Sequence, residues 1–312
     1  MLLRNTELIN KIDTGDLAAG GILLPEQSKK FFKMTFEATP FSKLHRKEQR
    51  AAKTGEIDKI AIGGRLLRKK IEDTDDNYRA GVTHGKVEYS TVAVRLPWEI
   101  TEETLRENIE GEAYEDLVMG MMTTQLGIDL EDLHWNGDSS LVADPFLSVN
   151  DGWLKKMSDG ATHVVDCTAD TKFNKSTFFK ILSELPNKFR SDKLRWMMSP
   201  NRALNWVEYL TGRSTGAGDA ALNGGGILGA APLGIPIVPI PSFGDDTIVL
   251  GDPQNFVAVW TYNIRIRKTT EGREAVMQDK RFYVVHLDDD PVIQELDACV
   301  LANNLTATTL TD

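Results

Sequence analysis

The sequence contains few cysteines and no long apolar run. Cys167 and Cys299 are its two cysteines, and their separation fits no metal-binding spacing, so we expect two buried thiols rather than a disulfide or a metal site. No apolar stretch approaches the roughly 20 residues that cross a bilayer. The first 16 residues carry charges where a signal peptide needs an apolar centre. These absences argue against a membrane or secreted protein and favour a protein made in a cytosol.

Catalytic motifs are also missing. The glycine triplet 224–226 is not followed by the Lys-Ser/Thr of a phosphate-binding loop, and no serine lies in a GxSxG frame. Asp288-Asp289-Asp290 could bind a cation, but consecutive carboxylates on an extended chain point in different directions, which favours a solvated turn. We expect surface or core histidines without metal-ligand spacing at His45, His84, His134, His163 and His286. The sequence therefore predicts no catalytic, cofactor-binding or metal site.

Charge is distributed unevenly. The chain has a net charge of −10, yet Lys43 to Lys86 holds 12 Lys and Arg against 7 Asp and Glu, a net +5 that leaves −15 elsewhere. This segment is either a solvated loop or an arm that docks on an acidic surface of an adjacent copy. A nucleic-acid role fits less well, because acidic residues between 72 and 76 interrupt the basic run and Tyr78 is its only aromatic residue.

The stretch from Lys86 to Asp138, with the basic segment directly before it, suggests a subunit that reaches across its neighbours. Residues 46–96 predict a long hairpin whose alternation changes phase near Ser90-Thr91, as at a bulge or a switch of sheet face. A helix from Glu112 to Trp135 follows, stopped by Asn136-Gly137-Asp138, and 24 residues make a rod of about 36 Å. Its predicted apolar stripe consists of Tyr114, Leu117, Val118, Met121, Met122, Gln125, Ile128 and Leu133.

The flanking regions differ in character. Residues 1–24 suit an extended arm, and a short helix beginning at Pro25 carries Phe31, Phe32 and Phe36, which need a partner surface. After the loop that ends at Met157 the pattern becomes α/β. We expect helices at 177–189 and 201–209, a buried strand at 194–200, and a proline-rich edge strand in "LGIPIVPIPSF". Further strands follow in "TIVLGDP", at 262–267 and from Tyr283, and "DACVLAN" closes the last unit.

Taken in order, these segments resemble the HK97-fold major capsid proteins of tailed bacteriophages, over about residues 20–301. The matching sequences are "GGILLPEQ", "KVEYSTVAVRLPWEITEETLREN", "LHWNGD", "RWMMSPNRALNWV", "PLGIPIVPIPSF", "VLGDPQNFVAVWTYNIRIRK" and "DACVLANN". Their fixed order and spacing carry the resemblance.

The resemblance implies an α+β fold with five parts. These are an N-terminal arm and short helix (1–42), an extended hairpin called the E-loop (43–92), a peripheral domain with a long spine helix (93–165), an axial domain (166–267), and a return to the peripheral domain with a C-terminal strand (268–312). On this mapping the basic segment is the E-loop. Candidate contacts with neighbouring subunits are Lys59, Arg65, Arg68, Lys69, Lys70, Phe31, Phe32 and Phe36. Candidate loop residues at capsomer axes are Gly216, Gly218, Gly224, Gly225 and Gly226.

The function implied is structural rather than enzymatic. Copies of the chain would form hexamers and pentamers of an icosahedral virion shell around double-stranded DNA, bound without sequence specificity, after assembly in the host cytoplasm. Portal and separate scaffolding or decoration proteins would be partners, with no cofactor and no membrane. Met1 is interpreted as a translation start, so no long scaffolding segment is expected before "GGILLPEQ". An E-loop lysine crosslink has no identifiable partner. The alternatives are an encapsulin-like compartment shell and a metal-dependent hydrolase that uses Asp288 to Asp290.

Overall fold

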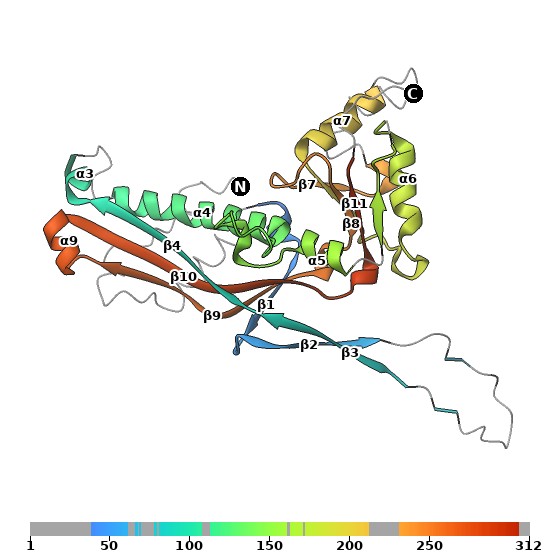
Figure 1. The fold of residues 1–312 in the computed structure, drawn as a ribbon, viewed down its shortest axis with the longest axis horizontal. Helices are drawn as coiled ribbons and strands as arrows, with labels where there is room; N and C mark the ends of the chain where they lie inside the picture. Colours follow the sequence, from blue (N-terminus) through green and yellow to red (C-terminus); the bar gives the residue numbers. More distant parts are fainter. Residues whose placement is uncertain are drawn as a thin grey trace, which may run out of the picture.

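The computed structural model describes residues 39–61, 66–67, 69, 78–79, 81–107, 113–160, 163–170, 172–211 and 231–305. Two sheets with flanking helices and a projecting two-stranded ribbon form the described part of the molecule (Figure 1). None of its described helices is both long and apolar enough to cross a bilayer.

The first sheet has four strands in the order β1-β9-β10-β4. These strands are β1 (Arg46–Arg50), β9 (Phe256–Thr269), β10 (Lys280–Ile293) and β4 (Val92–Thr101). The long helix α4 (Ala113–Asn136) lies alongside this sheet (Figure 1). Met119, Leu126 and Leu130 of α4 pack in one core with side chains of the sheet such as Trp98 and Tyr283. The predicted spine helix is thus confirmed, and it ends one residue later than expected.

The predicted apolar stripe of this helix is wrong in part. Leu117, Met121 and Ile128 are 50%, 64% and 43% exposed, whereas Leu133 is buried as predicted. The prediction merged two apolar faces that lie on opposite sides of the helix, since residues seven apart return to about the same face. The face with Met119, Leu126 and Leu130 belongs to the core of the first sheet, and Tyr114, Val118 and Met122 of the predicted stripe pack against that core.

The second sheet has five strands in the order β5-β11-β8-β6-β7. Its strands are β5 (Val164–Asp166), β11 (Cys299–Asn303), β8 (Ile248–Gly251), β6 (Arg195–Met198) and β7 (Ile237–Pro239). The helices α6 (Lys175–Glu184) and α7 (Pro200–Thr211) pack against it through a core that includes Phe178, Trp196 and Trp206. As the prolines predicted, β7 is an edge strand. The helix expected over 177–189 ends earlier, at Glu184, and a separate turn of 3₁₀ helix covers Asn187–Phe189 after Pro186.

A third core joins the two sheets. The aromatic rings of Phe41, Trp135, Trp153 and Phe256 lie in mutual contact, with Phe41 and Trp135 centroids 4.9 Å apart. Trp153 begins α5 (Trp153–Asp159), and two further short helices, α3 (Glu102–Glu107) and α9 (Arg273–Gln278), flank the far ends of β4, β9 and β10. Cys167 and Cys299 are free and buried, as predicted.

The ribbon consists of β2 (Thr54–Ala61) and β3 (Thr83–Ser90), paired antiparallel. It projects away from both sheets (Figure 1). The predicted change of phase is confirmed: β3 ends at Ser90 and β4 begins at Val92, so Thr91 separates the ribbon from the first sheet. The predicted hairpin begins too early in the chain, however. Arg46–Arg50 pairs in parallel with β9 inside the first sheet, and the ribbon begins at Thr54.

Candidate functional site

The root of the ribbon is held on the first sheet by a small core and by hydrogen bonds. Ile57 and Tyr89 pack on Val257, Val259 and Val292 of β9 and β10, a contact that an isolated two-stranded ribbon needs in water. At the junction, Thr91 donates its backbone N–H and its hydroxyl to the Lys53 carbonyl, at 2.8 and 3.1 Å. The ribbon therefore leaves the body at a defined position.

Asp290 on β10 adds a charged anchor. Its carboxylate accepts a bond from the Ser90 backbone N–H at 2.8 Å and from the Lys156 ammonium of α5 at 2.8 Å. Lys156 also donates to the Pro291 carbonyl at 2.5 Å. Burial raises the pKa of Asp290 despite the neighbouring ammonium and the Ser90 N–H. One carboxylate thus connects the ribbon, the sheet and α5.

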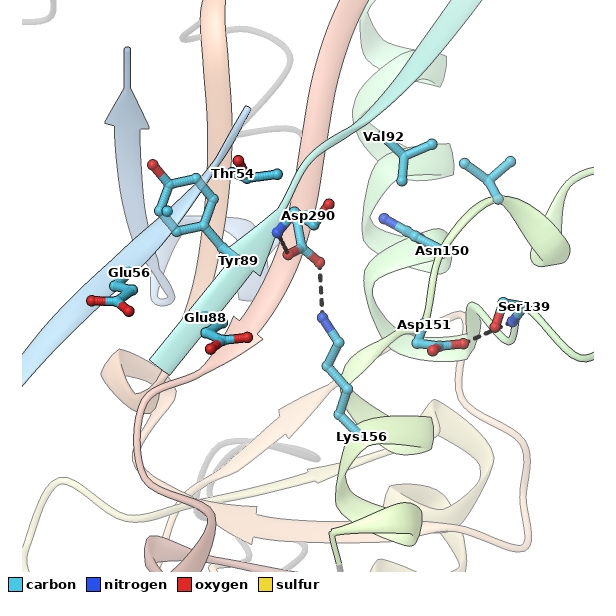
Figure 2. Close-up of a pocket in the computed structure, with 13 residues that line it drawn as sticks. Thr54, Glu56, Glu88, Tyr89, Val92, Ser139, Asn150, Asp151, Lys156 and Asp290 are labelled. Carbon is cyan, nitrogen blue, oxygen red and sulfur yellow. Dashed lines mark hydrogen bonds and ion pairs between the residues drawn. The ribbon is translucent and has the colours of Figure 1, made fainter. Parts of the chain in front are cut away.

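A cleft of about 690 Å³ opens between this root and the segment that follows α4. In Figure 2, β2 and β3 form one wall, the 139–156 segment forms the other, and Asp290 lies between them. Thirteen residues line the cleft: Thr54, Gly55, Glu56, Glu88, Tyr89, Ser90, Val92, Ser139, Val149, Asn150, Asp151, Lys156 and Asp290.

The cleft is acidic. Four carboxylates and one ammonium line it, and that ammonium, of Lys156, is already bound to Asp290. Glu56 and Glu88 are directly opposite each other across the ribbon, an arrangement of like charges that destabilises the pair unless a cation lies nearby. Lys86 reaches Glu56 through an exposed ion pair. Asp151 on the facing wall accepts a bond from the Ser139 N–H at 2.8 Å.

Asn150 adds an unsatisfied polar group to the cleft. This side chain is 6% exposed, and neither its amide nitrogen nor its amide oxygen has a hydrogen-bond partner in the part of the chain that the structure describes. Figure 2 draws it between the loop and the ribbon. Because a buried amide without partners costs free energy, its position favours an external group that can donate and accept hydrogen bonds.

The aspartate triplet is not the solvated turn that the sequence favoured. Asp288, Asp289 and Asp290 lie within β10, and Asp289 is 1% exposed beside the Nε2 atom of buried His134. The alternation of a strand explains the error, since it directs Asp289 into the molecule toward α4. Among the described residues no group of His, Cys, Asp or Glu could hold a metal ion.

The structure describes only some of the predicted contact residues. Lys59 forms an ion pair with Glu295 of the same chain at 3.1 Å, and Lys69 is exposed. The remaining candidates, Phe31, Phe32, Phe36, Arg65, Arg68, Lys70 and the five glycines between 216 and 226, lie outside the described residues. The cleft residues Glu56, Glu88, Asn150 and Asp151 were missed. Strand alternation in the sequence indicated Glu56 and Glu88, but whether they lie opposite each other depends on the register of the ribbon.

Comparisons with known proteins identify a curated relative and similar solved structures. No family model matches the chain. The chain is 30% identical to the putative prophage capsid protein YqbE of Bacillus subtilis (strain 168), over 95% of this chain and 97% of that protein.

Solved structures share the fold. A chain of the satellite phage P4 procapsid has a TM-score of 0.71 at 12% identity, covering 95% of this chain and 96% of that one. A capsid chain of an empty GTA particle has a TM-score of 0.61 at 11% identity over 86% and 91% of the two chains. A Mycobacterium phage Adephagia chain has a TM-score of 0.55 at 12% identity over 97% and 98%. The chain therefore belongs to the phage capsid proteins with the HK97-like fold.

Proposed function

We propose that this chain is the major capsid protein of a tailed phage and assembles as hexamers and pentamers into an icosahedral head around double-stranded DNA. The observation that carries the proposal is the 30% identity to a prophage capsid protein along nearly the whole of both chains. The projecting ribbon adds physical support, because the part of it beyond the Ile57–Tyr89 contact extends away from both sheets and can be covered by a neighbouring molecule (Figure 1).

Sedimentation of the purified protein tests assembly. Large closed particles are expected, held by interfaces above about 2,000 Å² per subunit, and a monomer that persists at high concentration and moderate salt would refute the proposal. Particles from a phage-producing culture should contain DNA. A protein cargo in place of DNA would favour the encapsulin-like alternative, for which the comparisons give no support.

The proposed role is structural, without catalysis. Two members of the aspartate triplet are engaged inside the fold, Asp289 by His134 and Asp290 by Lys156. This arrangement disfavours the remote hydrolase alternative. We assign the parts of the chain in the predicted order, from the arm (1–42) to the C-terminal return (268–312). The E-loop is narrowed to the ribbon of β2 and β3, β9 is assigned to the peripheral sheet, and β11 is assigned to the axial sheet. Portal and scaffolding proteins, packaged DNA and assembly in the host cytoplasm belong to the same proposal.

Within such a shell, the acidic cleft would receive the basic segment of a neighbouring E-loop. Residues 65–70, "RLLRKK", carry four positive charges, and the cleft presents three carboxylates besides Asp290. Lys and Arg donors satisfy Glu56 and Glu88, and the backbone of an entering segment can donate to and accept from the Asn150 amide. Each exposed pair is worth at most about 1 kcal/mol, but the contact repeats at every subunit.

Charge reversal tests this docking. Glu56→Lys with Glu88→Lys should lower particle yield in sedimentation, and so should Arg68→Glu with Lys69→Glu and Lys70→Glu, whereas combining both sets should restore part of the yield. The matched control is Glu103→Lys with Glu107→Lys, the same change of charge at exposed positions on α3. Normal yield from both reversed sets would refute the docking and leave shell formation untouched. Circular dichroism of the unassembled fraction verifies that each variant folds.

A further inference from the structure

The exposed face of α4 is an apolar stripe. Leu117, Met121, Thr124 and Ile128 follow one another at spacings of four, three and four residues, which places them within about 60° around the helix. The apolar side chains among them are exposed. This stripe lies opposite the face that packs on the first sheet, so no described element covers it.

The same face continues toward the end of the helix and is covered there. Glu131 and Trp135 extend the stripe at the same spacing, but they are 5% and 0% exposed. The start of the described chain contacts both residues, and Trp153, Phe243 and Phe256 also pack on Trp135. The Thr39 hydroxyl donates to the Glu131 carboxylate, and the Phe41 ring packs on Trp135 with a centroid distance of 4.9 Å.

These two contacts show in which direction the start of the described chain runs along α4. Moving back from Phe41 to Thr39 moves the contact from Trp135 to Glu131, one turn toward the N-terminus of the helix. Phe36 precedes Thr39 by three residues, which span at most about 10 Å. Ile128 lies about 4.5 Å along the axis from Glu131. The residues before Thr39 can therefore reach the uncovered stripe.

The sequence before Thr39 has the matching chemistry. Residues 25–38 read "PEQSKKFFKMTFEA" and place Phe31, Phe32, Met34 and Phe36 close together. We infer that residues 25–38 of the same chain dock along α4 and cover Leu117, Met121 and Ile128. The stripe extends about 17 Å from Leu117 to Ile128, and 14 residues span that length whether they are helical or extended. A cover in cis fixes the N-terminal segment on each subunit independently of shell assembly.

A crosslink tests the docking. The full-length Phe36→Cys, Ile128→Cys protein, treated with a short bis-maleimide while unassembled, should become linked within single chains. A tryptic digest would show the linked peptides, and a denaturing gel would show monomers. Cys167 and Cys299 are buried and do not compete. The control pair, Phe36→Cys with Val276→Cys on exposed α9, should stay unlinked. Links between chains only, or no link at all, would overturn the inference.

Limited proteolysis provides a second test. Trypsin cleavage at Lys29, Lys30 and Lys33 should be about tenfold faster in Met121→Asp than in the wild type, since a charge on the stripe disfavours the docked state. Met277→Asp, at an exposed site on α9, is the control and should leave the rate unchanged. Equal rates in Met121→Asp and the wild type would contradict docking on α4, even if shells form normally.

Discussion

Removing the Asp290 carboxylate tests how the ribbon is anchored. In Asp290→Ala the Ser90 N–H and the Lys156 ammonium both lose their carboxylate partner, and Lys156 keeps only the Pro291 carbonyl. In Asp290→Asn one amide oxygen remains and can accept from one of the two donors. The alanine variant should therefore be the less stable of the two.

The expected loss of stability follows from the hydrogen bonds that the Asp290 carboxylate accepts. Hydrogen bonds to charged groups contribute about 1.5–3 kcal/mol each, so losing two suggests a cost of about 3–6 kcal/mol. Burial raises the pKa of Asp290, which means that its ionised form is disfavoured in the fold, and removing that penalty offsets part of the loss. We expect a net loss of about 2–3 kcal/mol for Asp290→Ala and about 1 kcal/mol for Asp290→Asn.

Urea denaturation of the unassembled protein, followed by tryptophan fluorescence, measures both values. Asp288→Asn is the matched control, because Asp288 pairs with a half-exposed Lys53 at 3.3 Å, and such pairs contribute less than about 1 kcal/mol. An Asp290→Ala variant as stable as the wild type, or an Asp290→Asn variant less stable than Asp290→Ala, would contradict this role of Asp290.

Three further predictions concern His45, Gly55 and the two cysteines. Burial holds the pKa of His45 well below 6.5, so the unfolded state binds the proton first and stability should fall as pH drops below 6.5, by up to about 1.4 kcal/mol per pH unit. His45→Phe should reduce that slope in denaturation midpoints from pH 7.5 to 5.5, and identical slopes would contradict the assignment. Gly55→Ala should cost about 1–3 kcal/mol, because its Cβ would lie 2.6 Å from the Tyr89 hydroxyl oxygen; Tyr89→Leu in the same chain should recover part of the loss in urea midpoints, and no recovery would refute this cause. Burial raises the pKa of Cys167 to about 11 and of Cys299 to about 12, so both thiols should react with a disulfide reagent only after denaturation, and labelling of the native protein would contradict their burial.

Local signals in the sequence predicted the elements well. The break at Ser90-Thr91 was visible as a change of strand phase, and the end of α4 as Asn136-Gly137-Asp138. The edge position of β7 followed from prolines that cannot donate to a neighbouring strand. These features depend on residues close together in the chain, which is why pattern and turn chemistry were enough.

Local signals of this kind could not predict which strands far apart in the chain pair with each other. The placement of β1 beside β9, about 210 residues later, cannot be read from local alternation. The sequence does not show that Asp289 points inward, because its partner His134 is far away in the chain and only the fold places the two side by side. The burial predicted for the exposed stripe on α4 is wrong for a related reason. An α-helix with two apolar faces gives one merged pattern in the sequence. The cleft residues depend on ribbon register and on the approach of the 139–156 segment.

A reconstruction of the assembled particle by electron cryomicroscopy tests the central claim most directly. We predict a closed icosahedral shell of hexamers and pentamers in which the ribbon of each subunit lies over a neighbour, with residues 65–70 near Glu56 and Glu88 of that neighbour. An assembly without a closed shell, or a shell whose ribbons contact only their own subunits, would contradict the account.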